Sequence, residues 1–137
     1  MANESLEISD KEFAAVTQLD AAARYRHFLK RVADWQEAWS LYEDGWMTMH
    51  DDEGRLLLPL WPARRYAEAH RLPGWGEAAE ARSISLDRLL ENWLPGLKAD
   101  GRGVSIFPVA GKESSIQPSL DDFERDLRAE LERYGED

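Results

Sequence analysis

Tryptophan and arginine side chains gather around the segment LLLPLWPARRYAEAH at residues 56–70. The chain holds six tryptophans, and an indole ring can remove roughly 150–250 Å² from water or offer that area to a ligand. Two neighbouring arginines follow the proline, where a helix is expected to begin, and guanidinium groups there favour an anion. We therefore predict a site for a peptide or a small anionic ligand, lined by Tyr42, Trp46, Trp61, Arg64, Arg65, Tyr66 and Trp75.

The same tryptophans have a purely structural interpretation. Trp35 and Trp93 recur at helical spacing with other apolar residues, which predicts that both belong to the core. Trp75 lies in a loop rich in glycine and proline, where deep burial is harder, and the other three lie on or beside predicted strands. A cleft and a core both stay open as interpretations at this point.

Motifs that would indicate an enzyme or a cofactor are incomplete. The segment AGKES at residues 110–114 lacks the Ser or Thr of a phosphate-binding loop, and Gly101 and Gly103 lack the third glycine of a dinucleotide fingerprint. The acidic cluster at residues 51–54 does not alternate its oxygen ligands as a calcium loop does, so it predicts a solvated turn. We expect no cofactor, no metal and no catalytic residue.

The three histidines are separated in sequence, and none lies in a zinc-binding motif. His27 and His70 fall in predicted helices and are expected to be partly exposed. His50 is the only one flanked by carboxylates, those of Asp51 and Asp52, but no nucleophile can be assigned to it. A surface histidine is therefore favoured over a catalytic base.

The net charge of −10 is concentrated at the two ends of the chain. Residues 1–20 carry five acidic side chains against Lys11, and residues 119–137 carry eight against three arginines. This field repels phosphate backbones, which argues against nucleic-acid binding and favours a basic protein as a partner. No apolar run approaches the roughly 20 residues of a membrane helix, and cysteine and an export signal are both absent, so we expect a cytoplasmic protein that binds no membrane.

Capping and turn residues divide the chain into the elements of one α+β domain over residues 1–137, with helices packed on a mainly antiparallel sheet. We expect residues 1–8 to be disordered and residues 135–137 to be frayed. Ser9 and Asp20 predict the starts of two helices.

Strands and further helices are expected after Trp35, where the periodicity changes. The stretch 37–61 predicts a meander of three adjacent antiparallel strands, with a bulge or a free edge at Pro59, which has no N–H to donate. The remaining expected elements are a helix at 62–70, a strand at Ile84, a helix from Ser85 whose final turns contain Pro95 and Gly96, a strand at 103–109, a pairing segment at 114–117 and a helix from Ser119 to Tyr134.

Several segments together carry a family resemblance. They are RYRHFLKRVADWQEAWSLYEDGW, LLLPLWPARRYAEAH, SISLDRLLENWLPGLKADG and VSIFPV, over residues 24–109. This series resembles the bacterial family catalogued as domain of unknown function 2750, which implies a single domain but no known reaction, cofactor or catalytic residue. A looser architectural resemblance to SseB-type domains implies a binding or regulatory module.

Three hypotheses for function fit these observations. We favour a non-enzymatic binding module that uses the corner around Trp61. The second hypothesis is an acidic immunity-type protein or inhibitor, whose helices at residues 9–18 and 119–134 bind a basic protein partner. The third, an enzyme using His50, has the least support. Monomer and homodimer are both compatible with the sequence, because the apolar stripe of the last helix is sufficient for packing on its own sheet.

Overall fold

The computed structural model describes residues 8–42, 45–70, 79–109 and 115–135. Its helical elements are α1 (Asp10–Thr17), α2 (Ala21–Trp35), α3 (Arg64–Ala69), α4 (Leu86–Arg88), the π-helix η1 (Leu89–Trp93), α5 (Leu94–Ala99) and α6 (Leu120–Gly135). Its strands are β1 (Glu37–Tyr42), β2 (Met49–His50), β3 (Leu56–Leu60), β4 (Glu80–Ser85) and β5 (Gly103–Ile106). This mixture of helices and strands confirms the predicted α+β class.

The predicted helix starts are confirmed by their caps. The Ser9 hydroxyl accepts a hydrogen bond from the Glu12 amide at 3.1 Å, and the Asp20 carboxylate accepts one from the Ala23 amide at 2.8 Å. Ser119 caps α6 in the same way at 3.1 Å. These side chains satisfy amides that have no partner in the first turn of a helix, which is why the starts could be read from the sequence.

The predicted meander is wrong for its first strand. β1 pairs along its whole length with β4, antiparallel, whereas β2 pairs antiparallel with β3 and β3 pairs parallel with β5. β1 reaches β3 only through a bridge between Trp39 and Trp61. The longer ladder with β4 gives β1 more backbone hydrogen bonds than the short strand β2 could supply.

Pro59 lies inside a central strand, so the expected bulge or free edge is wrong. It is buried opposite Ser105 in the parallel ladder between β3 and β5. On its other side, the Pro59 carbonyl accepts a hydrogen bond from the Ser40 hydroxyl at 2.6 Å. The Pro59 carbonyl thus receives its hydrogen bond from a side chain of β1 instead of from a backbone N–H of a neighbouring strand.

The helix that begins at Ser85 contains Pro95 and Gly96 in its final turns, as expected. It passes through the π-turn η1, in which the Leu94 amide bonds to the Leu89 carbonyl, and continues as α5 to Ala99. Pro95 stands in the first turn of α5, where a missing N–H costs little. The wider turn lets the chain pass a proline without ending the helix.

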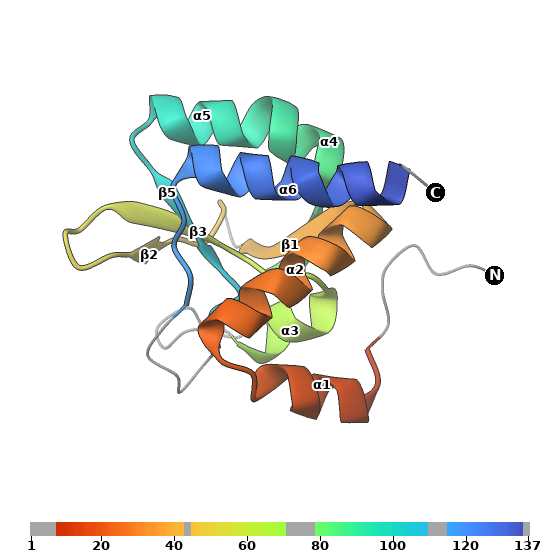
Figure 1. Ribbon diagram of the computed structural model, residues 1–137. Helices are drawn as coiled ribbons and strands as arrows, with labels where there is room; N and C mark the ends of the chain where they lie inside the picture. The colour runs from red at the N-terminus through yellow and green to blue at the C-terminus, as the bar shows by residue number, and fades with distance from the viewer. Residues whose placement is uncertain (1–7, 43–44, 71–78, 110–114, 136–137) are drawn as a thin grey trace.

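The helices lie on both sides of the strands. Figure 1 shows α5 and α6 running side by side above the strands, α2 crossing in front of them, and α1 with α3 below. Phe28, Leu60, Phe107 and Phe123 are among the fully buried side chains of the single core cluster that these elements enclose. No helix in the described ranges is long and apolar enough to cross a membrane.

Ile8 corrects the expected disorder of residues 1–8. Its side chain is buried, and its carbonyl accepts a hydrogen bond from Arg65 at 2.9 Å. Residues 1–7 lie outside the described part of the chain. Of the expected frayed tail, Gly135 is the last residue of α6, and residues 136 and 137 are not described.

Trp61 connects three strands at the centre of the fold. Its backbone N–H and carbonyl bond to Trp39 of β1 at 2.9 and 2.8 Å, and its indole N–H donates to the Pro108 carbonyl, just beyond β5, at 2.8 Å. The residue is 0% exposed. Buried polar groups of this kind are costly to leave without a partner.

We predict that Trp61→Phe lowers the free energy of unfolding by about 3 kcal/mol, because it leaves a cavity and an unpaired Pro108 carbonyl. Trp35→Phe is the matched control, since Trp35 is partly exposed and should cost less than about 1 kcal/mol. Urea denaturation followed by circular dichroism measures both. Equal losses in the two variants would contradict the central role of Trp61.

Candidate functional site

The structure divides the predicted aromatic and arginine site into separate parts. Trp61 and Tyr66 are both 0% exposed, so the expectation that they line an open surface is wrong. Both rings belong to the core cluster, and the Tyr66 ring lies under α1. Because protein interiors are closely packed, moving either ring to the surface would leave a cavity. Trp75 lies outside the described residues. Of the predicted set, Tyr42 and Trp46 are partly exposed and in contact with each other.

Tyr42, Trp46 and Trp93 form what we call the aromatic row. The rings of Tyr42 and Trp46 meet edge to face with centroids 5.3 Å apart, and those of Trp46 and Trp93 do so at 5.2 Å. The Arg82 guanidinium lies 3.9 Å from the Tyr42 ring centroid, within range of a cation–π interaction. All three aromatic side chains are only partly buried, so the row continues to the surface.

A pocket of about 220 Å³ opens beside the last ring of this row. Trp93 and Leu97 supply apolar walls, Asn92 an amide, and Asp100 and Arg102 opposite charges. Gly96 completes the lining, and a Cβ built on it would meet nothing within 4 Å. The pocket therefore combines apolar walls with a few polar groups, which is the usual composition of a binding site.

The turn after α5 positions the charged residues of the pocket. Gly101 has a φ of +71°, the Arg102 amide bonds to the Leu97 carbonyl at 2.9 Å, and the Gly101 amide bonds to the Lys98 carbonyl at 3.2 Å. This is the Schellman arrangement, which favours glycine at the left-handed position. It places Asp100 and Arg102 on either side of Gly101 and at the same pocket.

Trp93 was expected in the core, and this expectation is wrong in part. Its side chain packs against the core but stays partly exposed, because the extra residue of the π-turn shifts the phase of the helix faces after Leu89. Sequence analysis also missed Asn92, Asp100 and Arg102. The available signal was Pro95, since a proline within a helical pattern indicates an irregular turn.

Arg64 and Arg65 contact different partners. The Arg64 guanidinium lies over the ring of buried Trp39 at 4.9 Å. Arg65 instead binds the N-terminal segment: it pairs with the Asp10 carboxylate at 2.7 Å, donates to the Ile8 carbonyl and covers the Phe13 ring at 4.4 Å. Arg65 therefore contacts a carboxylate of the protein itself, that of the 95% exposed Asp10, and Arg64 does not share this contact.

His70 is buried, which corrects the expectation of partial exposure, and its ring stacks on that of Phe13 with centroids 5.8 Å apart. Burial, with a smaller effect of the Arg24 charge, lowers the pKa of His70 to about 4. Burial also lowers the pKa of His27, helped by Arg31 and opposed by Glu12. Both histidines are therefore neutral near pH 7.

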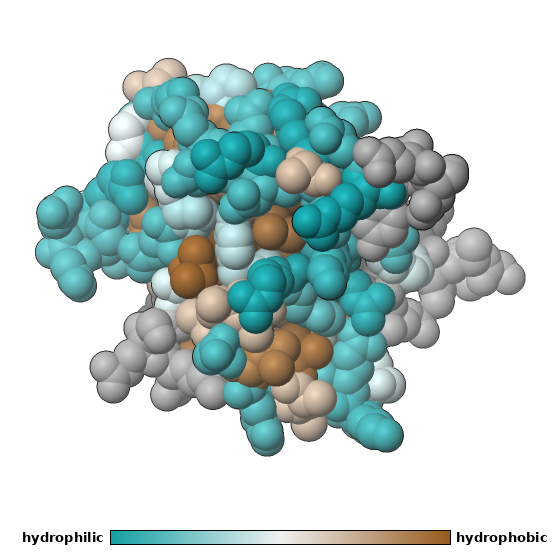
Figure 2. All heavy atoms as spheres, viewed as in Figure 1, coloured by the Kyte–Doolittle hydropathy of each residue, from teal (hydrophilic) through white to brown (hydrophobic). Residues whose placement is uncertain are grey.

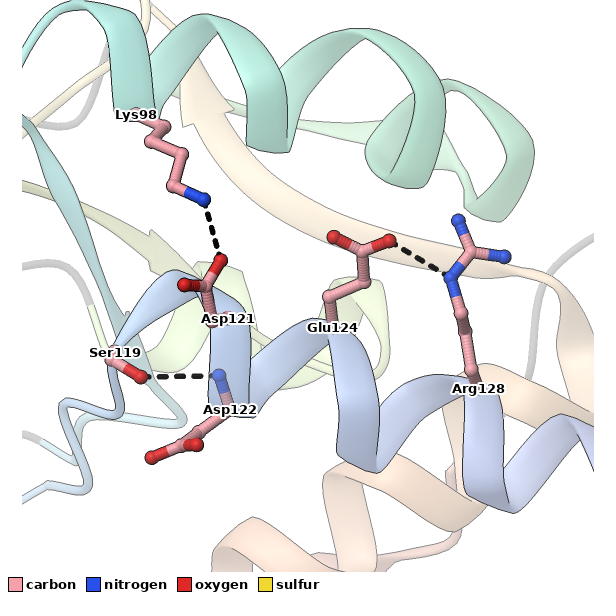
Figure 3. Close-up of polar contacts among 6 residues, drawn as sticks. All are labelled: Lys98, Ser119, Asp121, Asp122, Glu124 and Arg128. Atoms are coloured by element: carbon pink, nitrogen blue, oxygen red, sulfur yellow. Dashed lines mark hydrogen bonds and ion pairs between the residues drawn. The ribbon is translucent and has the colours of Figure 1, made fainter.

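Several acidic residues of α6 are paired with cations. Figure 3 shows Lys98 bound to Asp121 at 2.6 Å and Arg128 bound to Glu124 at 2.8 Å. Further along the helix, Arg125 pairs with Asp122 and Arg133 with Glu130. The six carboxylates of α6 lie among three arginines and beside Lys98, so this surface carries opposite charges with an acidic excess.

The acidic turn near His50 is held by its own backbone. Asp51 accepts hydrogen bonds from the amides of Glu53 and Arg55 at 2.9 and 2.8 Å, as in a solvated turn. These bonds, with the amide of Arg55 as the largest cause, lower the pKa of Asp51. In the described part of the chain, no group of three or more acidic or histidine side chains is arranged to hold a metal ion.

We predict that stability falls as the pH is lowered from about 6.5 to about 4, because the unfolded chain binds a proton at His70 in this range and the folded chain does not. The loss attributable to His70 is on the order of 3 kcal/mol at the acid end. Urea denaturation at a series of pH values measures it. His70→Gln should flatten the profile and His50→Gln, at an exposed position, should not; parallel profiles for both would contradict the assignment.

Comparison with known proteins places these features in a family. No curated protein matches the chain. The model of a family described as a protein of unknown function (DUF2750) matches residues 25–127, a range that includes the aromatic row and the pocket. The match gives no support to the looser resemblance to SseB-type domains. The chain therefore belongs to the DUF2750 family of proteins of unknown function.

Proposed function

We propose that this protein is a non-enzymatic binding module that holds an extended peptide segment at the aromatic row and its pocket. The observation that carries the proposal is the partly exposed Trp93 ring, which is both the end of the row and a wall of the pocket. A segment lying along the row would place one apolar side chain against Trp93 and Leu97. Aromatic-lined grooves of this kind are a recurrent way of binding extended peptides.

Two features favour a peptide over a small anionic ligand. The pocket volume of about 220 Å³ is below the roughly 300–1,000 Å³ of typical small-molecule sites and suits a single side chain. Asp100 lines it together with Arg102, so an anion would meet a carboxylate as well as a guanidinium. A peptide backbone, which donates and accepts hydrogen bonds, can use both groups and the Asn92 amide.

The composition of the pocket also supports binding without catalysis. Its described lining offers an amide, a carboxylate and a guanidinium, with no serine, cysteine or histidine to act as a nucleophile or base. The alternative of an acidic inhibitor has weaker support, because the ion pairs on α6 reduce the uniform negative potential that it requires.

Gly96 offers a test of this proposal that does not depend on weakening the fold. We predict that Gly96→Leu fills the pocket and reduces peptide binding at least about tenfold, or 1.4 kcal/mol. Its helical conformation and open surroundings mean that the substitution adds no clash and should not lower stability. The measurement is selection of a phage-displayed library of random linear peptides on the wild-type protein, followed by fluorescence polarisation with the enriched peptides.

Gly96→Ala is the matched control. It should retain binding and raise the free energy of unfolding by about 0.5–1 kcal/mol. Trp93→Ala should lose binding, whereas Trp35→Ala, at another partly exposed helical tryptophan, should retain it. Failure to enrich any peptide, or equal binding by the Leu and Ala variants at Gly96, would refute the proposal. If the enriched peptides lose binding only in the Arg65→Ala variant, they bind at Arg65 and not at the pocket.

A further inference from the structure

The helix α1 is held to the rest of the protein by contacts that resemble those of a bound ligand. Arg31 pairs with Glu12 at 2.8 Å, and Arg65 pairs with Asp10 at 2.7 Å. The Phe13 ring stacks on Tyr66 at 5.4 Å and on His70, with the Arg65 guanidinium against it. In both ion pairs α1 supplies the carboxylate, and the surface beneath supplies the guanidinium.

Two polar side-chain atoms beneath this helix are buried and make no hydrogen bond to the described residues. The Tyr66 hydroxyl is fully buried, and neither it nor His27 Nε2 has a hydrogen-bond partner among the described residues. His27 Nε2 lies 3.9 Å from Glu12, beyond hydrogen-bond distance. Permanent core interfaces rarely leave such groups unpaired, so each calls for an explanation. We name the area formed by His27, Arg31, Arg65, Tyr66 and His70 the covered surface.

The range that matches the family begins inside α2, so α1 and the first residues of α2 both precede it. All five residues of the covered surface fall within the matched range 25–127, whereas α1 precedes it. Figure 2 shows apolar atoms gathered at the boundary between α1 and α2, on a face that is otherwise mostly hydrophilic. Along α1, Val16 is the buried apolar residue, and Phe13 is only partly buried. The centre of the covered surface, Tyr66 and His70, is buried, and its edge, His27, Arg31 and Arg65, is only partly buried.

We propose that the covered surface is a docking surface for a short acidic helix of a partner protein, and that α1 occupies it in cis. We infer the chemistry of the partner helix from the contacts that α1 makes with this surface. It is a helix with two carboxylates in its first turn, matching Arg31 and Arg65, followed by an aromatic ring that stacks on Tyr66 and His70. Because α1 and α5 lie at opposite ends of the molecule in Figure 1, this surface is independent of the proposed peptide pocket.

The proposal can be tested in the full-length chain by weakening the contacts that hold α1 on the covered surface. Asp10→Asn with Glu12→Gln removes both ion pairs and leaves Phe13 and the fold intact. The probe is a fluorescein-labelled peptide of residues 8–19 of this chain, measured by fluorescence polarisation. We predict that the double variant binds it about tenfold more tightly than the wild type, because two ion pairs of the internal competitor are lost. Hydrogen exchange at the α1 amides should accelerate in the same variant.

Matched variants identify the contacts responsible. Adding Arg65→Ala to the double variant should reduce peptide affinity about tenfold, and a Phe13→Ala peptide should not bind. Lys11→Gln, at an exposed position on α1, should behave as wild type, and Trp93→Ala should leave this binding unchanged. Absence of peptide binding despite faster exchange, unchanged exchange, or binding indifferent to Arg65 would overturn the proposal. A peptide-displaceable dimer in light scattering would also overturn it, in favour of helix exchange between two copies.

Discussion

The fold depends on the hydrogen bonds of Trp61 at the point where its strands converge. Its backbone connects β3 to β1, and its indole N–H reaches the Pro108 carbonyl at the end of β5. The next buried groups depend on this corner: Phe107 has a φ of +60°, unusual for a bulky residue, and the buried Arg24 donates to its carbonyl at 3.1 Å. Trp61, which the sequence favoured for recognition, is therefore buried in the core, and the partly exposed rings are those of Tyr42, Trp46 and Trp93.

The π-turn determines which aromatic ring of the helical segment reaches the surface. One extra residue per turn rotates the helix face, so Trp93 leaves the apolar stripe and meets Trp46 at the surface. The same helix then ends in a turn at Gly101 that brings a carboxylate and a guanidinium to the opening. The pocket thus results from two irregular turns in one continuous helical segment, and the row joins Trp93 of that segment to Trp46 and to Tyr42 of β1.

Several of the carboxylates behind the net charge of −10 form ion pairs at the surface, where the side chains of Asp10 and Asp121 stay 95% and 75% exposed. Asp10 and Glu12 pair with arginines beneath α1, and Asp121 and Glu124 pair with cations on or beside α6. Each pair at the surface contributes little to stability, but together they determine which face remains available to a charged partner. In the described part of the chain, these four carboxylates are therefore also contacts of the fold.

The sequence by itself determined the α+β class, the helix starts and the amphipathic helices, because capping and periodicity act within a few residues. Ser9, Asp20 and Ser119 were identified correctly for this reason. Only the tertiary structure decided the partner of β1, the burial of Trp61 and the exposure of Trp93. These properties depend on contacts between segments far apart in the chain and on a π-turn whose single extra residue changes no local propensity. Local patterns indicate which residues can be buried, and long-range packing selects those that are.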